Sequence, residues 1–250
     1  MFDSHAHYED EKFAADRYEL LDSLFNTGIT GIINCGSDKE TSFASMELAE
    51  KYENIYFAAG VHPHSSPVCG DFEEWLIPLL SHPKCVAIGE IGLDYYYDTP
   101  KDAQMKVFKR QLEIADRLNK KVIIHNRDSH KDLYDTVSLF PNVKGVFHSF
   151  SGSAEFAKML VKDGWYISFS GVITFKNAEK PVKAVSEVPF DRLLCETDCP
   201  YLTPHPHRGK INHSGYLEWT IKKLAEIKGI SFEEMAGLTE QNAKTLFGIK

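Results

Sequence analysis

Two histidines near the start of the chain are spaced so that both can bind the same metal ion. The run Asp3-Ser4-His5-Ala6-His7 follows the strand-forming residue Phe2. Successive side chains alternate between the two faces of a β-strand, so His5 and His7 point to the same side. Two imidazoles at that separation can chelate one divalent cation. The alternative is a solvated stretch with two unrelated histidines, and the rest of the chain decides between these interpretations.

More side chains that can bind metals stand where other predicted strands end. They are His62 and His64, Glu90, His125, His148, and Glu196 with Asp198. In a parallel α/β barrel the carboxyl ends of all strands meet at one rim, which is where such folds place active sites. A single histidine is usually structural, but the repeated placement at strand ends predicts a shared metal site.

Short apolar runs alternate with longer amphipathic stretches along the whole chain. Several runs are apolar without alternation, which indicates strands buried on both faces. Apolar residues at helical spacing occupy 41–51, 101–119 and 216–228, and Ser231 with Glu234 has the spacing of an N-terminal capping box. We expect eight strands, at residues 2–6, 31–35, 55–61, 85–90, 121–125, 144–148, 166–170 and 192–196.

This alternation predicts a single (β/α)8 TIM barrel of the metal-dependent hydrolase type. A doubly wound open sheet is the competing architecture, but no glycine-rich fingerprint follows the first predicted strand. No linker, low-complexity run or repeat interrupts the pattern. We therefore expect one domain over residues 1–250.

Composition narrows the class of protein. The chain has 250 residues, of which 43% are hydrophobic, so it can bury a large core. No signal peptide and no apolar stretch long enough to span a bilayer are found, which predicts a cytoplasmic protein without a membrane partner. The five cysteines are scattered and predict reduced thiols. A net charge of −8 argues against a protein that coats nucleic acid by charge alone, but not against a nucleic-acid enzyme.

The types of donor indicate a catalytic site. Imidazoles and carboxylates without a thiolate are typical of catalytic metal sites. Six ligands exceed what one open tetrahedral ion uses, so we expect two divalent cations, with Glu90 bridging them. The donor set admits Mg²⁺, Mn²⁺ or Zn²⁺. The six candidate ligands are His5, His7, Glu90, His125, His148 and Asp198.

Seven sequence blocks, in order and over essentially the whole chain, resemble the TatD family of metal-dependent deoxyribonucleases in the amidohydrolase-like superfamily. The blocks are Phe2–His7, Gly60–His64, Ile88–Tyr96, Val122–Asp128, Gly145–Ser153, Leu194–Leu202 and Arg208–Lys210. The resemblance implies the same six ligands. It assigns His5, His7 and Asp198 to the first cation and His125 and His148 to the second, and it makes Glu90 a shared ligand.

The resemblance also implies a phosphodiesterase that acts on DNA. Two cations would activate a water molecule for attack on phosphorus, with Asp198 and Glu90 as the catalytic residues. We expect 3′-5′ exonuclease action on single-stranded DNA or chain ends, and a monomer, although the oligomeric state is left open. Tyr95, Tyr96 and Tyr97 could stack on unpaired bases or could serve in packing. The expected substrate contacts are His62, His64, Arg127, Arg208 and Lys210, and Glu196 could be structural.

One departure from the family pattern concerns the loop after Arg208–Lys210. The family usually continues with Asn-Glu-Pro, whereas this chain has Ile211-Asn212-His213-Ser214. His213 therefore stands in place of the usual acidic residue, which puts the geometry of this loop in doubt.

Two other functions compete with the deoxyribonuclease. A similar metal cage could hydrolyse esters or amides, for example as a D-aminoacyl-tRNA deacylase, because a shared fold does not fix the bond that is cleaved. The cationic residues Arg127, Arg208 and Lys210 favour a phosphate substrate over this one. A non-catalytic metal-binding module is the third interpretation, but such a relative should have lost a ligand and all six are present.

Overall fold

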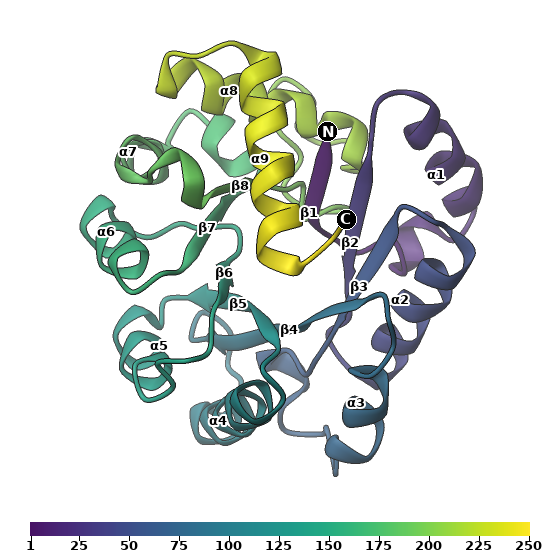
Figure 1. Cartoon of the computed structure of the whole chain (residues 1–250), viewed down its shortest axis with the longest axis vertical. Helices are drawn as coiled ribbons and strands as arrows, with labels where there is room; N and C mark the ends of the chain where they lie inside the picture. Colours follow the sequence, from purple (N-terminus) through teal and green to yellow (C-terminus); the bar gives the residue numbers. More distant parts are fainter. The chain divides into compact units, whose positions relative to one another are not determined.

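A computed structural model describes residues 1–250. All eight expected strands are present, and they follow one another in the sheet in the order of the chain. Helices connect them, so the expected (β/α)8 TIM barrel fold is confirmed. The strands are β1 (Phe2–Ala6), β2 (Gly31–Cys35), β3 (Ile55–Ala59), β4 (Cys85–Asp94), β5 (Lys121–Arg127), β6 (Gly145–Phe147), β7 (Tyr166–Phe169) and β8 (Leu193–Cys195) (Figure 1).

Two of the helices begin at N-terminal capping boxes. Ser231 and Glu234 form the expected capping box, and Asp38 with Thr41 forms a second one. The helices are α1 (Arg17–Asn26), α2 (Lys39–Lys51), α3 (Glu73–Leu79), α4 (Lys101–Leu118), α5 (His130–Val137), α6 (Ala154–Lys162), α7 (Glu179–Glu187), α8 (Leu217–Lys228) and α9 (Phe232–Phe247).

The chain folds into two compact units. Unit 1 comprises residues 1–34 and 148–250, and unit 2 comprises residues 35–147. Unit 1 contains β1, most of β2, β7 and β8, together with α1 and α6 to α9; unit 2 contains β3 to β6 and α2 to α5. The expectation of one domain over residues 1–250 stays a prediction.

In unit 1 the first strand pairs with the segment that follows the last one. Ala6 forms a parallel bridge with Cys199, and the amide of His7 donates to the carbonyl of Cys199 at 2.8 Å. Helix α9 packs against β8 and β1 (Figure 1). The two ends of the sequence thus meet in one hydrogen-bonded layer, which brings residues near position 5 beside residues near position 198.

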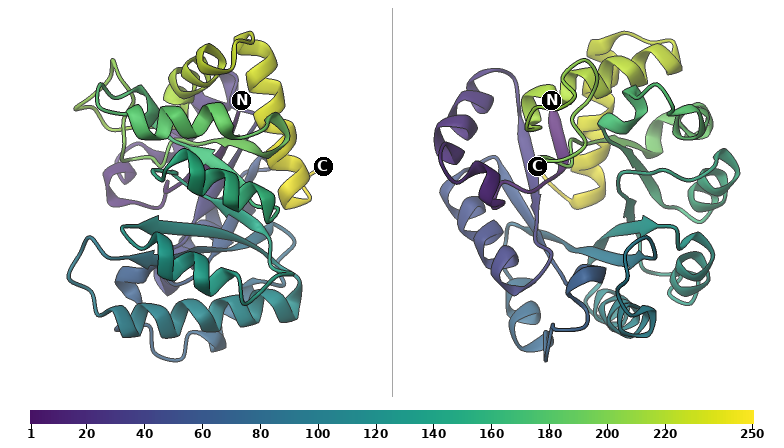
Figure 2. Two further views of the ribbon diagram at one scale, coloured as in Figure 1. Left: turned by 90° about the vertical axis from the view of Figure 1, so that its left-hand side faces the viewer. Right: turned by 180° about the vertical axis from the view of Figure 1, so that it is seen from behind.

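In unit 2 the long helix α4 lies alongside β4 and β5 (Figure 2). Its buried face carries Val107, Phe108 and Leu112, but also the glutamines Gln104 and Gln111. Burying an amide without partners costs free energy, so these two side chains must form hydrogen bonds inside the protein.

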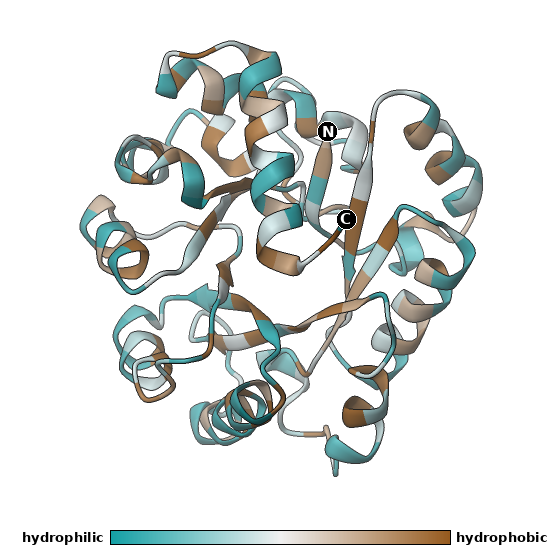
Figure 3. Cartoon of the chain, viewed as in Figure 1, coloured by the Kyte–Doolittle hydropathy of each residue, from teal (hydrophilic) through white to brown (hydrophobic).

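The core follows the strands in both units. Ile32 and Ile33 of β2 and Ile123 and Ile124 of β5 have no exposed surface, and in Figure 3 hydrophobic colour follows the strands while helices such as α4 change colour around their circumference. All five cysteines are free, as expected. None of the helices has the length and apolar content needed to cross a membrane.

Candidate metal centres

Three ligand atoms of unit 1 form a triangle of the size that one cation requires. The Nε2 atoms of His5 and His7 lie 3.0 Å apart, and Oδ1 of Asp198 lies 3.6 Å from the first and 3.5 Å from the second. Tetrahedral ligands with metal bonds of roughly 2.0–2.2 Å stand about 3.3–3.6 Å from one another. The donor set of unit 1 therefore fits a divalent cation.

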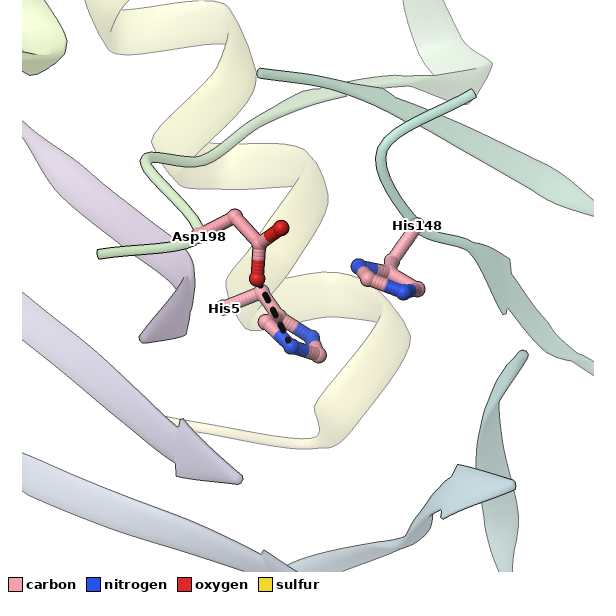
Figure 4. A group of neighbouring side chains, drawn as sticks. All are labelled: His5, His148 and Asp198. Carbon is pink, nitrogen blue, oxygen red and sulfur yellow. Dashed lines mark ion pairs between the residues drawn. The ribbon is translucent and has the colours of Figure 1, made fainter. Parts of the chain in front are cut away.

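His148, from the loop after β6, completes what we call the first cluster: His5, His7, His148 and Asp198. Its ring lies parallel to that of His5 at 4.0 Å between centroids. One ligand atom each from His5, His148 and Asp198 lies within 4.8 Å of the others (Figure 4). The resemblance assigned His148 to the second cation, whereas in the structure it groups with ligands predicted for the first. The assignment of single ligands to cations stays a prediction.

Two carboxylates orient the histidines of the first cluster. Oε1 of Glu196 accepts from the amide of Ser149 at 2.7 Å and lies 3.2 Å from Nδ1 of His148. Oε1 of Glu9 lies 3.3 Å from Nδ1 of His7. Contacts at Nδ1 leave Nε2 of each ring as the nitrogen that can bind a cation. Oε2 of Glu196 is buried without a hydrogen-bond partner, which also suits a site that takes up a cation or its water.

A buried polar network centred on Asp3 holds the segment that carries Asp198. The carboxylate of Asp3 accepts from the amide and hydroxyl of Thr197 at 2.9 and 2.6 Å, and from the hydroxyl of Ser214 at 2.7 Å. The hydroxyl of Tyr8 donates to Ser214 at 2.8 Å. Burial raises the pKa of Asp3 to about 6, although the hydrogen bonds from Thr197 and Ser214 act in the opposite direction. The network joins three segments that are far apart in the sequence.

The backbone of Asp198 adopts an unusual conformation, and its surroundings favour the charged carboxylate. Its φ of 57° lies in the left-handed region, and its amide donates to the carbonyl of His5 at 3.0 Å. Burial disfavours the charged form, but the contact with His7 and the charges of His5 and His148 outweigh it and lower the pKa of Asp198. The carboxylate is thus ready to act as an anionic ligand.

The second cluster lies within unit 2 and consists of His62, Glu90 and His125. Oε1 of Glu90 lies 2.7 Å from Nδ1 of His125 and 3.6 Å from Nε2 of His62. The three residues again offer one ligand atom each within 4.8 Å. His62 was expected as a substrate contact, and the structure places it beside two predicted ligands. The donors of this cluster, two imidazoles and a carboxylate, also fit a divalent cation.

Asp94 orients the second cluster, and the sequence interpretation gave it no role. Its Oδ2 lies 2.9 Å from Nε2 of His125 and 3.4 Å from Nε2 of His64. This contact turns Nδ1 of His125 toward Glu90. Burial raises the pKa of Asp94, but hydrogen bonding and charge from His125 outweigh that effect and the net shift is downward. The sequence block Gly-Leu-Asp-Tyr could have revealed this role of Asp94. The strand was expected to end at residue 90, but β4 continues to Asp94.

The two glutamines of α4 hold the backbone on either side of the second cluster. Gln104 accepts from the amide of Asp94 at 2.8 Å and donates to its carbonyl at 2.9 Å. Gln111 accepts from the amide of Val61 at 2.8 Å and donates to its carbonyl at 3.0 Å. Val61 directly precedes His62. Polar residues seven apart on the apolar face of a predicted helix were the signal that could have revealed this pair.

Comparisons with known proteins agree on one family. The family model described as "TatD related DNase" matches residues 2–248. The chain belongs to the TatD-related DNase family. It is 43% identical to the uncharacterized metal-dependent hydrolase YabD of Bacillus subtilis over 253 residues, which covers 100% of this chain and 99% of YabD. It is 38% identical to the uncharacterized metal-dependent hydrolase YcfH of Escherichia coli K12, covering 100% of this chain and 96% of YcfH.

A solved structure of a TatD homologue supports the same assignment. The crystal structure of YJJV from Escherichia coli K12 matches with a TM-score of 0.89 and 29% identity, covering 100% of this chain and 98% of that one. The relatives are named as metal-dependent hydrolases, and this TatD protein has two clusters of suitable ligands. It is therefore a metal-dependent hydrolase.

Two predicted substrate contacts, Arg208 and Lys210, lie in the loop after β8, as does His213, the departure from the TatD pattern. Nη1 of Arg208 donates to the carbonyl of Thr203 at 3.1 Å, and its guanidinium lies 4.1 Å from the ring centroid of Phe175. The side chain of Lys210 is exposed. His213, where the TatD pattern has an acid, accepts from the amide of Gly215 at 3.2 Å and begins a short 3₁₀ helix. Burial lowers the pKa of His213, so this loop is anchored by a neutral ring.

Proposed function

We propose that the protein is a deoxyribonuclease that hydrolyses phosphodiester bonds of single-stranded DNA, as a 3′-5′ exonuclease that uses two divalent cations. The observation that carries this proposal is the pair of clusters, each with histidines and a carboxylate and neither with a thiolate. Donor sets of this type are used in catalytic sites, and paired cations are common in enzymes that cleave phosphodiesters.

Each cluster supplies the ligands of one cation in this proposal. His5, His7 and Asp198 would hold one, and Glu90 and His125 would hold the other. His148 would be a ligand of the second cation by the resemblance and of the first by its place in the first cluster. Glu90 as a ligand of both stays a prediction. The donor types admit Mg²⁺, Mn²⁺ or Zn²⁺. When bound, the cations supply a water of lowered pKa and positive charge for the phosphate oxygens.

Side chains of the protein would accept the proton of the attacking water and bind the substrate. Oδ1 of Asp198 faces the histidines, which leaves Oδ2 to orient the attacking water and accept its proton. Arg127, Arg208 and Lys210 would bind phosphate oxygens, the arginines through two parallel N–H donors. His64, which is 40% exposed, would contact the substrate.

A cleavage assay tests the proposal. The protein, stripped of metal with EDTA, is supplied with Mg²⁺, Mn²⁺ or Zn²⁺ and 5′-labelled single-stranded DNA. We expect stepwise shortening from the 3′ end, and its loss in Asp198→Ala and Glu90→Ala. Asp191→Ala, at a surface aspartate with a 71% exposed side chain, is the matched control and should cleave as the wild type does.

Three outcomes would contradict the proposal. Equal cleavage by wild type and both ligand variants would mean that a contaminating nuclease is responsible. Cleavage within the strand would refute the exonuclease mode. Metal-dependent hydrolysis of an aminoacyl-tRNA ester without any cleavage of DNA would assign the protein to the competing ester-hydrolase class.

A further inference from the structure

Two large aromatic side chains lie exposed beside the second cluster. Tyr96 is 60% exposed and Tyr97 is 50% exposed. Their rings meet edge to face at 5.0 Å between centroids. The guanidinium of Arg127 lies 3.8 Å from the ring centroid of Tyr96 and 5.3 Å from that of Tyr97. We call Tyr96, Tyr97 and Arg127 the tyrosine shelf.

Direct contacts join the shelf to the second cluster. The ring of His64 meets the ring of Tyr97 edge to face at 4.6 Å, and its Nε2 lies 3.4 Å from Asp94, the residue that orients His125. The amide of Tyr96 donates to Asp94 at 3.0 Å. The position of the shelf relative to His125 is therefore set by direct contacts through His64 and Asp94.

The neighbouring Tyr95 has a different environment. Its hydroxyl donates to Asp132 at 2.9 Å, and Nζ of Lys101 lies 4.1 Å from its ring centroid. The hydrogen bond and the cation–π contact hold the side chain of Tyr95 in place. Tyr96 and Tyr97 instead contact one another and Arg127, and their hydroxyls form no hydrogen bond. Arg127 has no carboxylate within ion-pair distance, and all three side chains are exposed, so the open parts of the two rings and of the guanidinium can be reached by a ligand.

The chemistry of the shelf suits one ligand. Nucleobases stack on aromatic rings and on guanidinium planes, and an arginine without a carboxylate partner attracts a phosphate. A base in the middle of a duplex has both faces covered by its neighbours. The last base of an unpaired strand has one face free and no partner base to hold it in the stack, so it can move onto another aromatic surface. We propose that the tyrosine shelf stacks the 3′-terminal unpaired base of a DNA strand. This inference rests on the proposed nuclease function and deepens it by assigning the groups that select an unpaired end.

Paired substrates test the inference. Two 5′-labelled single strands are compared that differ only in the presence or absence of the base on the 3′-terminal nucleotide. We expect the wild type to cleave the strand with the base with about a ten- to hundredfold higher kcat/KM, the range expected from one base–aromatic stack. In the double variant Tyr96→Leu/Tyr97→Leu the ratio of the two kcat/KM values should approach one.

Matched variants separate stacking from general damage. Tyr96→Phe/Tyr97→Phe keeps the rings and should keep the ratio. Tyr18→Leu removes a tyrosine of similar exposure, 47%, from α1 of unit 1 and should behave as the wild type. Thermal unfolding followed by circular dichroism shows whether the double leucine variant is folded.

A binding measurement does not depend on turnover. A single strand that ends in 2-aminopurine, with a phosphorothioate as its last linkage to slow cleavage, should lose fluorescence when it binds the wild type and much less when it binds the double leucine variant. Unchanged quenching, or an unchanged kcat/KM ratio in a folded double leucine variant, would overturn the shelf and leave the nuclease function standing. Absence of DNA cleavage by the wild type would overturn the nuclease function itself, and the shelf with it.

Discussion

The two clusters are positioned by different kinds of chemistry. In unit 1 an ionisable carboxylate, Asp3, gathers hydroxyl and amide donors from Thr197 and Ser214. In unit 2 two neutral amides, Gln104 and Gln111, hold the backbone at both ends of the cluster from a single helix. A buried carboxylate thus holds the segments that meet at the first cluster, whereas neutral amides hold the backbone on either side of the second cluster.

The side chains around the two clusters also differ in the proportion of imidazole to carboxylate. In the first cluster three histidines, His5, His7 and His148, surround one carboxylate, Asp198. In the second, two histidines, His62 and His125, stand beside the carboxylate of Glu90, and a further carboxylate, Asp94, contacts His125. Imidazole-rich sites favour Zn²⁺ and similar ions, and oxygen donors extend the range to Mg²⁺ and Mn²⁺. We therefore expect the two clusters to differ in metal preference.

The largest effect should come from removing a ligand. Asp198→Ala and Glu90→Ala should each lower kcat/KM for DNA by about a thousandfold, since a bound cation supplies several kcal/mol of transition-state stabilisation. Metal content measured by mass spectrometry should fall in both, with Zn²⁺ lost preferentially from Asp198→Ala. The same metal loss pattern in both variants would show that the clusters do not differ in preference.

Asp3 and Gln111, which hold the first and the second cluster in place, should contribute differently to the free energy of unfolding. Asp3→Ala leaves two hydroxyls and an amide without their acceptor and should lower the free energy of unfolding by about 3 kcal/mol. Gln111→Leu orphans the amide and carbonyl of Val61 and should cost about 2 kcal/mol. Urea unfolding of the metal-free protein measures both. The control Asp3→Asn keeps one acceptor and should cost less than Asp3→Ala; a larger loss for Gln111→Leu than for Asp3→Ala would reverse the comparison.

The orienting carboxylates should affect metal affinity more moderately. Glu196→Gln in unit 1 and Asp94→Asn in unit 2 should each weaken metal binding by about 10- to 100-fold, because each fixes a ring nitrogen of a ligand histidine. Competition with a chromogenic chelator measures the affinity. Asp191→Asn is the control at a surface carboxylate, and unchanged affinity in Glu196→Gln would show that His148 is not a ligand.

The smallest effects concern two carboxylates far from either cluster. Glu240 in α9 accepts from Thr30 at 2.7 Å and pairs with Lys244 at 2.8 Å; burial raises its pKa, but these partners outweigh burial and lower it. The hydrogen bond from Arg110 lowers the pKa of Glu73 in α3. Both stabilise the fold above their ordinary pKa of 4.5, and the effect is lost as pH falls through their lowered pKa values.

Single substitutions measure these two contributions. Glu240→Gln should cost about 1 kcal/mol and Glu73→Gln about 0.5 kcal/mol at pH 7, with both costs shrinking toward pH 3. Urea midpoints at several pH values provide the test. A cost that does not change with pH would mean that the carboxylate acts by packing and not by charge.

The sequence by itself determined the fold class and the types of metal donor. Local patterns were sufficient for this, because strand burial, helical periodicity and polar residues at strand ends are properties of short segments. The pairs His5-x-His7 and His62-x-His64 and the block around Glu90 were visible for that reason. The extension of β4 to Asp94 was missed because a tertiary contact, the pair of hydrogen bonds between Gln104 and the backbone of Asp94, decides where that strand ends.

Only the tertiary structure decided which residues stand together within each unit. In the folded chain the ring of His148 stacks on that of His5, and His62 lies beside Glu90. Asp3 accepts a hydrogen bond from Thr197, and Glu196 contacts His148. The spacing of residues in the sequence does not predict these contacts. Residues 3, 197 and 214 come together only in the folded chain, where burial and hydrogen bonding compensate for the entropy lost on closing the long loops between them. Donor chemistry is a property of residue type, whereas the geometry that a cation or a base requires is a property of the folded chain.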